Sequence, residues 1–523
     1  MKKLYIVCLA ACLVFSSSCK KYLDVNTNPN APEDAAANLY LAPMLHWMVT
    51  SPQFEGRFVG RYTQNWILLS TIVGTWERQG YDPSSDNGGQ LWRDVYWTLG
   101  HNLNLMIKKA EAEKRYDLLG VGYILKAWGW QSLTDLHGEI IIKEAPDATK
   151  TAFNYDTQEF AYSEVKRLLE LAITNLQRTD GFVNQSYLAV GDKIYNGDRS
   201  KWIKYANGML AMHLNHYSNK SSYNPTAVID AVDKSFASNA DDPLLGYTGI
   251  TNDDTNFWGP RRQNLQNYRQ TQFIVNLLNG TQFQGVVDPR LTRMLAPAPD
   301  GVYRGMDINL VNGGTFTATQ RPNNLWGYPN NVSGGTLSRY IFDDKSQLPA
   351  MTYSQLQFIK AEAAYRRDKN SPLALQAYRN GVSSHIDFVN SRNLDNKQTP
   401  TQISADEKAA YLGSPAIIPL TPANLTLSHI MSQKYIAQWG WGHLETWMDL
   451  RRYHYTDVDP STGKQVFLGF ALPTDIYGDN GGKTVQRLRP RFNSEYVWNI
   501  PALEKIGALA ADYQTKPLWI IEP

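Results

Sequence analysis

Apolar residues recur at helical spacing in several long segments, and this pattern constrains the fold of the chain most strongly. In residues 155–177, five of them stand at positions i, i+3, i+4, i+7 and i+11, which is one face of an α-helix. They are Val165, Leu168, Leu169, Ala172 and Leu176. Asp156 or Thr157 can cap the start. The segment predicts an amphipathic helix of about five turns.

A second segment, residues 351–367, combines a cap with an apolar stripe. Thr352 and Gln355 have the spacing of a capping box, and apolar residues repeat at helical intervals after them. Three further segments have the same pattern: residues 118–137, 200–218 and 425–452. Residues 246–350 are instead dominated by Gly, Pro, Asn and Thr, which predicts loops and short strands. The sequence therefore predicts a mainly α-helical protein with a long irregular middle.

The first 18 residues have the three-part order of a secretion signal. Two lysines precede an apolar run of twelve residues, Leu4–Phe15, and three serines follow it before Cys19. That order is typical of a signal peptide, and the run is shorter than the roughly 20 residues that span a bilayer. Cleavage could fall at an ordinary small-residue site or directly before Cys19. In the second case Cys19 becomes the lipidated N-terminus.

Cysteine use agrees with lipidation. Cys8 and Cys12 lie in the predicted signal peptide, and no cysteine follows Cys19. A lipidated mature chain would have no free thiol and no disulfide, which suits an oxidising exterior.

Residues 19–38 are polar after Cys19 and predict a tether. No Gly/Ser-rich or Pro-rich linker divides the rest, so we expect residues 39–523 to form one domain.

Charge and motifs exclude several classes of function. The 51 basic and 49 acidic residues become 49 and 49 when Lys2 and Lys3 leave with the signal, and a neutral chain lacks the basic excess of nucleic-acid binding. No zinc-protease, nucleophile-elbow or phosphate-loop motif is present. His213 and His216 have a spacing that could share a metal, but no acidic or Cys partner is near them in the sequence, which favours packing. The prediction is no metal and no cofactor.

Seven segments, in this order, make the chain similar to the SusD/RagB family of outer-membrane nutrient-binding lipoproteins. They are "CKKYLDVNTNPN" from Cys19, "LKAWGWQSLTDLHGEIIIKEA" at 125–145, "NYDTQEFAYSEV" at 154–165, "GDKIYNGDRSKWIKYANGMLAMHL" at 191–214, "VVDPRLTRMLAPAPDGVYRG" at 286–305, "FIKAEAAYRR" at 358–367 and "QRLRPRFNSEYVWN" near the end.

The resemblance implies a fold, a partner and a role. The fold is mainly α, SusD-like, with four tetratricopeptide-like helix pairs, long irregular loops and a few short strands. The partner is a SusC-type TonB-dependent barrel, on which a lipid-anchored protein at the cell surface acts as a lid and hands over captured glycan. Because family members also bind peptides, a RagB-like lid of a peptide importer remains an alternative, and the sequence does not decide between sugar and peptide.

Glycan binding needs aromatic rings for the sugar faces and polar groups for the hydroxyls, and three loops carry both. The candidate ligand-binding residues are Trp76, Arg78, Tyr81 and Asn87 in residues 75–90, Asp253 and Trp258 in residues 251–262, and Asn323, Trp326 and Tyr328 in residues 321–331. Regular packing partners are scarce in loops, so we expect Trp76, Trp258 and Trp326 to be exposed.

Other aromatic residues have helical spacing and are expected to pack inside the body. They are Trp92, Tyr96, Trp97, Trp128, Trp202 and Trp447. A surface glycosidase is a further alternative, since two carboxylates brought together by the fold suffice for that chemistry. The adjacent pairs Asp253–Asp254 and Asp343–Asp344 are the candidates, although solvated loops explain them more simply. We therefore expect a binding protein and not an enzyme.

Overall fold

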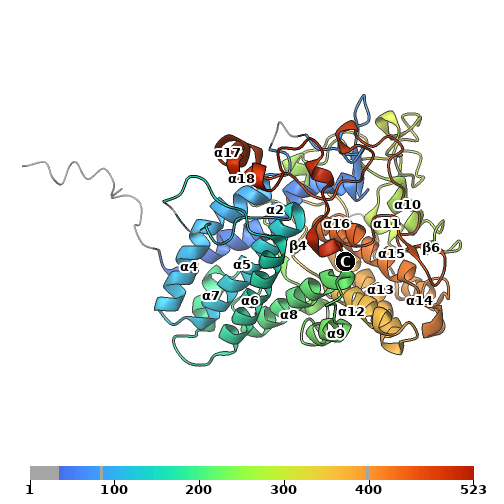
Figure 1. Cartoon of the computed structure of the whole chain (residues 1–523). Coiled ribbons are helices and arrows are strands. Elements are labelled where there is room, and N and C mark those ends of the chain that lie inside the picture. The colour runs from blue at the N-terminus through green and yellow to red at the C-terminus, as the bar shows by residue number, and fades with distance from the viewer. Residues whose placement is uncertain (1–34, 83–85, 146, 148, 396–399) are drawn as a thin grey trace, which may run out of the picture.

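The computed structural model describes residues 35–82, 86–145, 147, 149–395 and 400–523. Within them, 17 α-helices and six short strands are joined by long loops (Figure 1). The helices are α2 (Leu41–Tyr62), α3 (Gln90–Arg93), α4 (Gly100–Ala112), α5 (Tyr116–His137), α6 (Gln158–Gln177), α7 (Gln185–Gly191), α8 (Arg199–His216), α9 (Pro225–Asp233), α10 (Gln272–Leu278), α11 (Leu291–Met294), α12 (Tyr353–Arg367), α13 (Pro372–Arg392), α14 (Ala405–Gly413), α15 (Leu427–Gln438), α16 (His443–Arg452), α17 (Phe492–Trp498) and α18 (Ile500–Lys505).

The strands form three two-stranded antiparallel sheets. The pairs are β1 (Trp66–Leu68) with β3 (Tyr268–Gln270), β2 (Leu244–Leu245) with β4 (Leu348–Pro349), and β5 (Val458–Asp459) with β6 (Lys464–Gln465). Each pair has only two or three residues per strand, so the sheets fasten loops together and do not form a layer of their own.

Helices that follow one another in the sequence also pack against one another. α4 packs on α5, α5 on α6, α6 on α8, α8 on α9, and α12 on α9, α13 and α15. The apolar stripe predicted in α6 is fully buried, and the Thr157 hydroxyl caps the helix by accepting from the N–H of Phe160 at 3.2 Å. Thr352 caps α12 in the same way. The predicted mainly α-helical, helix-pair fold is confirmed.

Two secondary-structure predictions differ from the structure. The helix expected over residues 425–452 is split into α15 and α16, because Gly440 takes a left-handed φ of +88°, which ends a helix. A Cβ at this position would lie 3.0 Å from the Ile341 side chain, so glycine also suits the close packing here. The irregular middle, residues 246–350, contains the short helices α10 and α11 besides its loops and strands.

Charged side chains link the helices inside the body. Glu362 on α12 accepts hydrogen bonds from Arg452 on α16, at 2.8 Å and 3.0 Å. Lys434 on α15 donates to Asp449 on α16 at 2.9 Å. All four side chains are buried. Burial would raise the pKa of Glu362, yet the Arg452 guanidinium holds it well below its ordinary value. The network is therefore ionised in the folded protein.

Buried histidines give the first testable prediction. Burial lowers the pKa of His137, His213 and His443 from 6.5 to about 3, so below pH 6.5 the unfolded chain binds protons that the folded protein does not. Each of them removes about 1.4 kcal/mol of stability per pH unit in this range. His216 lies between Asp135 and Glu445 and has a raised pKa. Its stabilisation is complete below pH 6.5 and is lost at higher pH. Glu55, whose pKa burial raises to about 7, also binds its proton in the folded protein over this range, so these two groups offset part of the loss.

We therefore expect the free energy of unfolding to fall by a few kcal/mol between about pH 6.5 and pH 5.5. Denaturant unfolding at the two pH values measures it. Equal stability at both would contradict the neutral, buried state of these three histidines. His213→Gln should flatten the pH dependence, because one proton acceptor of the unfolded chain is removed.

The predicted signal peptide, Cys19 and most of the predicted tether lie outside the described residues. Ala37 and Asn38, assigned to the tether, are buried in a 3₁₀ turn over Ala37–Tyr40 that packs on α4 and α7. The ordered body thus begins at or before Ala37. No helix in the described part of the chain has the length and apolar character to cross a membrane.

Candidate functional site

A pocket of about 500 Å³ lies between the start of the helical body and the C-terminal segment that contains α17. We call it the Trp97 pocket. It is lined by Trp92, Arg93, Tyr96, Trp97, Ile141, Ala145, Asp147, Lys150, Phe153, Arg491, Ser494 and Glu495. Pockets of this size with an aromatic floor and a few polar groups are typical small-ligand sites.

A π-helical turn, Asp94–Thr98, directly follows α3 and carries Tyr96 and Trp97 of the pocket lining. The buried Asp94 carboxylate holds this turn, because it accepts from Ser51 at 2.6 Å and from Thr98 at 3.1 Å. Glu55 accepts from the N–H of Leu91 at 2.8 Å and so fixes the start of α3. Burial raises the pKa of Glu55 to about 7. π-helical turns are rare and occur frequently at functional sites.

Three aromatic residues of α3 and the π-helical turn have different environments. Trp92 is buried and packs edge-on against His137, with ring centroids 4.9 Å apart. Tyr96 is half-buried, and its hydroxyl donates to the carbonyl and accepts from the N–H of Ile141, at 2.9 Å and 2.8 Å. Trp97 is 75% exposed. The expected burial of Trp97 was therefore wrong, because Trp97 is the next residue after Tyr96 in the π-helical turn and faces outward.

A second exposed indole stands on α17, a helix that contributes residues to the pocket lining. Trp498, at the end of α17, is 73% exposed. The next residue, Asn499, is fixed to Phe153 in the pocket wall, because its amide donates to the Phe153 carbonyl at 2.9 Å and accepts from the Phe153 N–H at 3.1 Å. α17, which carries Trp498, is thus fastened to the loop before α6, and its residues Ser494 and Glu495 line the Trp97 pocket.

Polar groups surround this aromatic surface. Arg491 pairs with Asp86 at 2.6 Å, and Glu495 accepts from the Tyr155 hydroxyl at 2.7 Å. Arg93 and Lys150 are exposed at the rim. Guanidinium, ammonium and carboxylate groups at the edge of an aromatic floor are suited to hydrogen-bonding hydroxyl groups.

The predicted exposure of Trp258 and Trp326 was wrong. Trp258 is 0% exposed, and its Nε1 donates to the side chain of Gln53 on α2 at 2.8 Å. Trp326 is 1% exposed and donates from Nε1 to the carbonyl of Trp258 at 2.7 Å. The two loops meet each other and α2 in the core. A ring without an exposed face cannot stack on a sugar in this conformation.

Trp76 was also expected to be exposed and is 4% exposed. Its ring contacts Phe58 and Tyr62 of α2 and the buried Tyr81, with centroids 4.8 to 5.2 Å apart. Arg78 pairs with Asp475 at 2.9 Å. This loop nevertheless reaches the Trp97 pocket, through the contact of Asp86 with Arg491.

The other predicted site residues are dispersed. The Asn87 carbonyl accepts from Tyr81 at 2.8 Å, and the Tyr328 hydroxyl donates to the Leu337 carbonyl at 3.1 Å. Asn323 is buried, whereas Asp253 is exposed. None of the nine predicted ligand-binding residues lines the Trp97 pocket. Their role in ligand binding stays a prediction.

The two adjacent acidic pairs, Asp253–Asp254 and Asp343–Asp344, differ in burial. Asp253 is exposed, but Asp343 and Asp344 are buried and accept from backbone N–H groups, including Ser338 and Arg261 at 3.0 and 2.9 Å. The explanation of Asp343–Asp344 by a solvated loop was therefore wrong, because these carboxylates fix buried turns. Within the described ranges, no group of three His, Cys, Asp or Glu side chains is arranged to hold a metal.

The sequence contained two signals for the missed residues. Trp498 belongs to the segment 486–499 that carries part of the family resemblance. Trp97 follows Tyr96 directly, and adjacent residues cannot share one face of a helix.

The comparisons place the chain in a family. A family model described as "Starch-binding associating with outer membrane" (SusD-like) matches residues 29–467. The chain therefore belongs to the SusD/RagB family, as the sequence resemblance predicted. No curated protein matches the sequence.

Solved structures share the fold over nearly the whole chain. A SusD/RagB family protein from Bacteroides thetaiotaomicron is 18% identical, with a TM-score of 0.67 over 93% of this chain and 99% of its own. A SusD homologue from Bacteroides fragilis is also 18% identical, with a TM-score of 0.70 over 94% and 100%. A chitin-binding protein is 22% identical, with a TM-score of 0.68 over 93% and 100%.

Proposed function

We propose that this protein captures oligosaccharides or polysaccharides at the cell surface in the Trp97 pocket and passes them to a SusC-type TonB-dependent barrel in the outer membrane. The observation that carries the proposal is the 75% exposure of Trp97 in the lining of a pocket with a polar rim. An aromatic ring exposed at a pocket with polar groups around it is suited to packing against a ligand. The starch-binding description of the family supports a glycan as that ligand.

The proposal is tested by a binding screen in which glycans and peptides compete. Starch and chitin oligosaccharides are titrated into the full chain by calorimetry, beside a mixture of peptides of similar length. We expect glycan affinities in the micromolar to millimolar range, because a few stacked rings contribute about 1–3 kcal/mol each by analogy with bases. Binding of peptides without any glycan would replace this proposal by the peptide-importer alternative.

Binding without catalysis is part of the proposal. Incubation of the purified protein with each bound glycan should release no new reducing ends. Their appearance would require a glycosidase, and the screen would then have to be repeated as an assay of hydrolysis.

Trp97→Ala is expected to weaken glycan binding by about tenfold or more, since tenfold corresponds to 1.4 kcal/mol and one stacked ring contributes about that amount. The melting temperature should hardly change, because the ring is exposed. Tyr123→Ala is a matched control, since it removes a half-buried ring of α5 outside the pocket. Unchanged affinity in Trp97→Ala would contradict the site.

We further propose that residues 1–18 are a signal peptide and that a lipid on Cys19 holds the protein on the outer membrane, facing the exterior. Buried acyl chains contribute roughly 0.8 kcal/mol per methylene, and two or more anchor a protein stably. Cys19→Ala should therefore appear in the soluble fraction after cell lysis. Membrane retention of this variant would contradict the anchor.

A barrel should copurify with the parent chain after gentle detergent extraction, and its absence would contradict the transfer role.

A further inference from the structure

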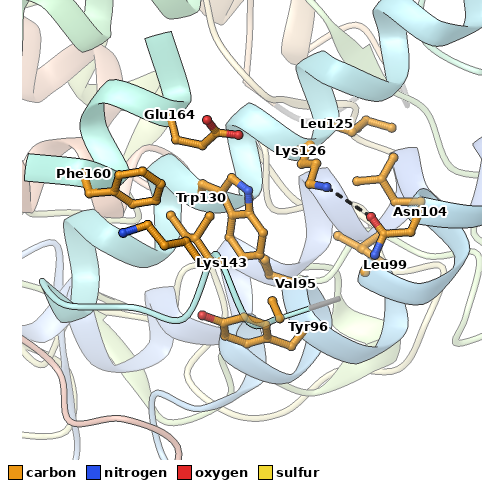
Figure 2. A pocket seen from close by; sticks show the side chains of 15 residues that line it. Val95, Tyr96, Leu99, Asn104, Leu125, Lys126, Trp130, Lys143, Phe160 and Glu164 are labelled. Carbon is orange, nitrogen blue, oxygen red and sulfur yellow. Dashed lines mark hydrogen bonds between the residues drawn. The ribbon is translucent and has the colours of Figure 1, made fainter. Parts of the chain in front are cut away.

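A second pocket, of about 280 Å³, lies between α4, α5 and α6 (Figure 2). We call it the α4–α6 pocket. Most of its lining is apolar. The apolar lining residues include Leu99, Leu103, Leu125, Trp130, Ile142 and Phe160. It adjoins the Trp97 pocket, since Tyr96 and Ala145 line both. The two hydrogen bonds between the Tyr96 hydroxyl and Ile141 hold this shared wall in place.

Three charged side chains line the α4–α6 pocket: Lys126, Lys143 and Glu164. Lys143 pairs with Asp156 at 3.1 Å, and its ammonium lies 4.0 Å from the centre of the Phe160 ring. Glu164 pairs with Arg167 at 2.7 Å. These two pairs leave the ammonium of Lys126 as the remaining charge of the pocket lining.

Lys126 is half-buried, and its ammonium donates to a neutral acceptor, Oδ1 of Asn104, at 3.2 Å (Figure 2). It forms no ion pair with any carboxylate in the described part of the chain. Burial lowers the pKa of Lys126, and the nearby Glu164 carboxylate offsets only part of this shift, as expected when an ammonium loses water without forming an ion pair. An anionic group at the pocket mouth would compensate this desolvation.

The interior restricts what can be attached to that anion. Hydroxyl groups placed among Leu99, Leu103 and Leu125 would lose their hydrogen bonds to water, at a cost of about 1–3 kcal/mol each, which disfavours a sugar. An apolar cavity of about 150 Å³ is large enough for benzene, so this pocket has room for a ring with a short chain. The indole Nε1 of Trp130, buried in the same wall, has no acceptor among the described residues.

We propose that the α4–α6 pocket binds a small carboxylate with an apolar body, whose carboxylate pairs with Lys126 while the body packs against Leu103, Leu125 and Trp130. This ligand class differs from the glycan of the Trp97 pocket. The site therefore stands independently of the proposed function.

Hydrocinnamate and its neutral analogue, hydrocinnamyl alcohol, test the proposal by calorimetry on the full chain. The parent should bind the acid at least about tenfold more tightly than the alcohol, because a charge-assisted contact is worth about 1.4 kcal/mol more than a neutral one. Lys126→Met should remove that preference and leave the alcohol affinity unchanged. Lys108→Met, on the exposed face of α4, is the matched control and should behave as the parent.

Two further variants locate the ligand. Asn104→Trp places a large ring at the exposed mouth and should abolish binding of both compounds, with an unchanged melting temperature as the check on folding. Trp97→Ala should retain full hydrocinnamate affinity. No binding to the parent, equal affinity for acid and alcohol, or loss of binding in Trp97→Ala would each overturn the proposal.

Discussion

Trp258→Ala is expected to lower the free energy of unfolding by roughly 3–5 kcal/mol, the usual cost of removing a fully buried Trp. The substitution opens a cavity beside Trp66 and His443, whose ring centroids lie 5.1 Å and 5.8 Å from that of Trp258. It also leaves the Gln53 side-chain oxygen without its indole donor. Denaturant unfolding followed by circular dichroism measures the change.

Trp498→Ala is the matched control for Trp258→Ala. The same atoms are removed from an exposed position, so stability should change by no more than about 0.5 kcal/mol. Equal destabilisation by the two substitutions would contradict the assignment of Trp258 to the core and Trp498 to the surface.

Glu362→Gln is expected to destabilise the protein by about 3–5 kcal/mol, because it leaves buried cations without their main counter-charge. Besides Arg452, Glu362 accepts from Tyr453 at 2.6 Å and from Asn215 at 2.9 Å. The substitution keeps the shape of the side chain but puts a donor where these partners need an acceptor. Thermal and denaturant unfolding give the size of the effect.

Glu170→Gln provides the comparison for a surface pair. Glu170 and Lys166 lie one turn apart on α6, 3.5 Å from each other, and both are about half exposed. Such pairs contribute about 0.3–0.5 kcal/mol. If Glu362→Gln cost no more than Glu170→Gln, the buried network would contribute nothing beyond an ordinary surface contact.

The helices could be predicted from the sequence because their signals are local. The stripe from Val165 to Leu176 and the Thr157 cap lie within one segment, and both are found in α6. The division between α15 and α16 falls beside Gly440, whose left-handed backbone packs close to Ile341, a residue about a hundred positions away in the sequence. Periodicity contains no information about such a contact, so the break was missed.

The candidate site was predicted poorly for a related reason. A loop rich in Gly, Asn and Asp can lie on the surface or fold inward, and its composition is the same in both cases. Trp258 and Trp326 are buried because their loops meet each other and Gln53 of α2. The Trp97 pocket is assembled from segments far apart in the sequence, since Phe153 in its wall is bound to Asn499. Tertiary contacts therefore decide which aromatics are exposed.

A crystal structure of the full chain with the tightest-binding oligosaccharide from the screen tests the central claim most directly. We expect sugar rings in the Trp97 pocket, with one ring stacked on the exposed indole of Trp97 and hydroxyls within hydrogen-bond distance of the rim residues. Sugar bound elsewhere on the protein, with the Trp97 pocket unoccupied, would contradict it.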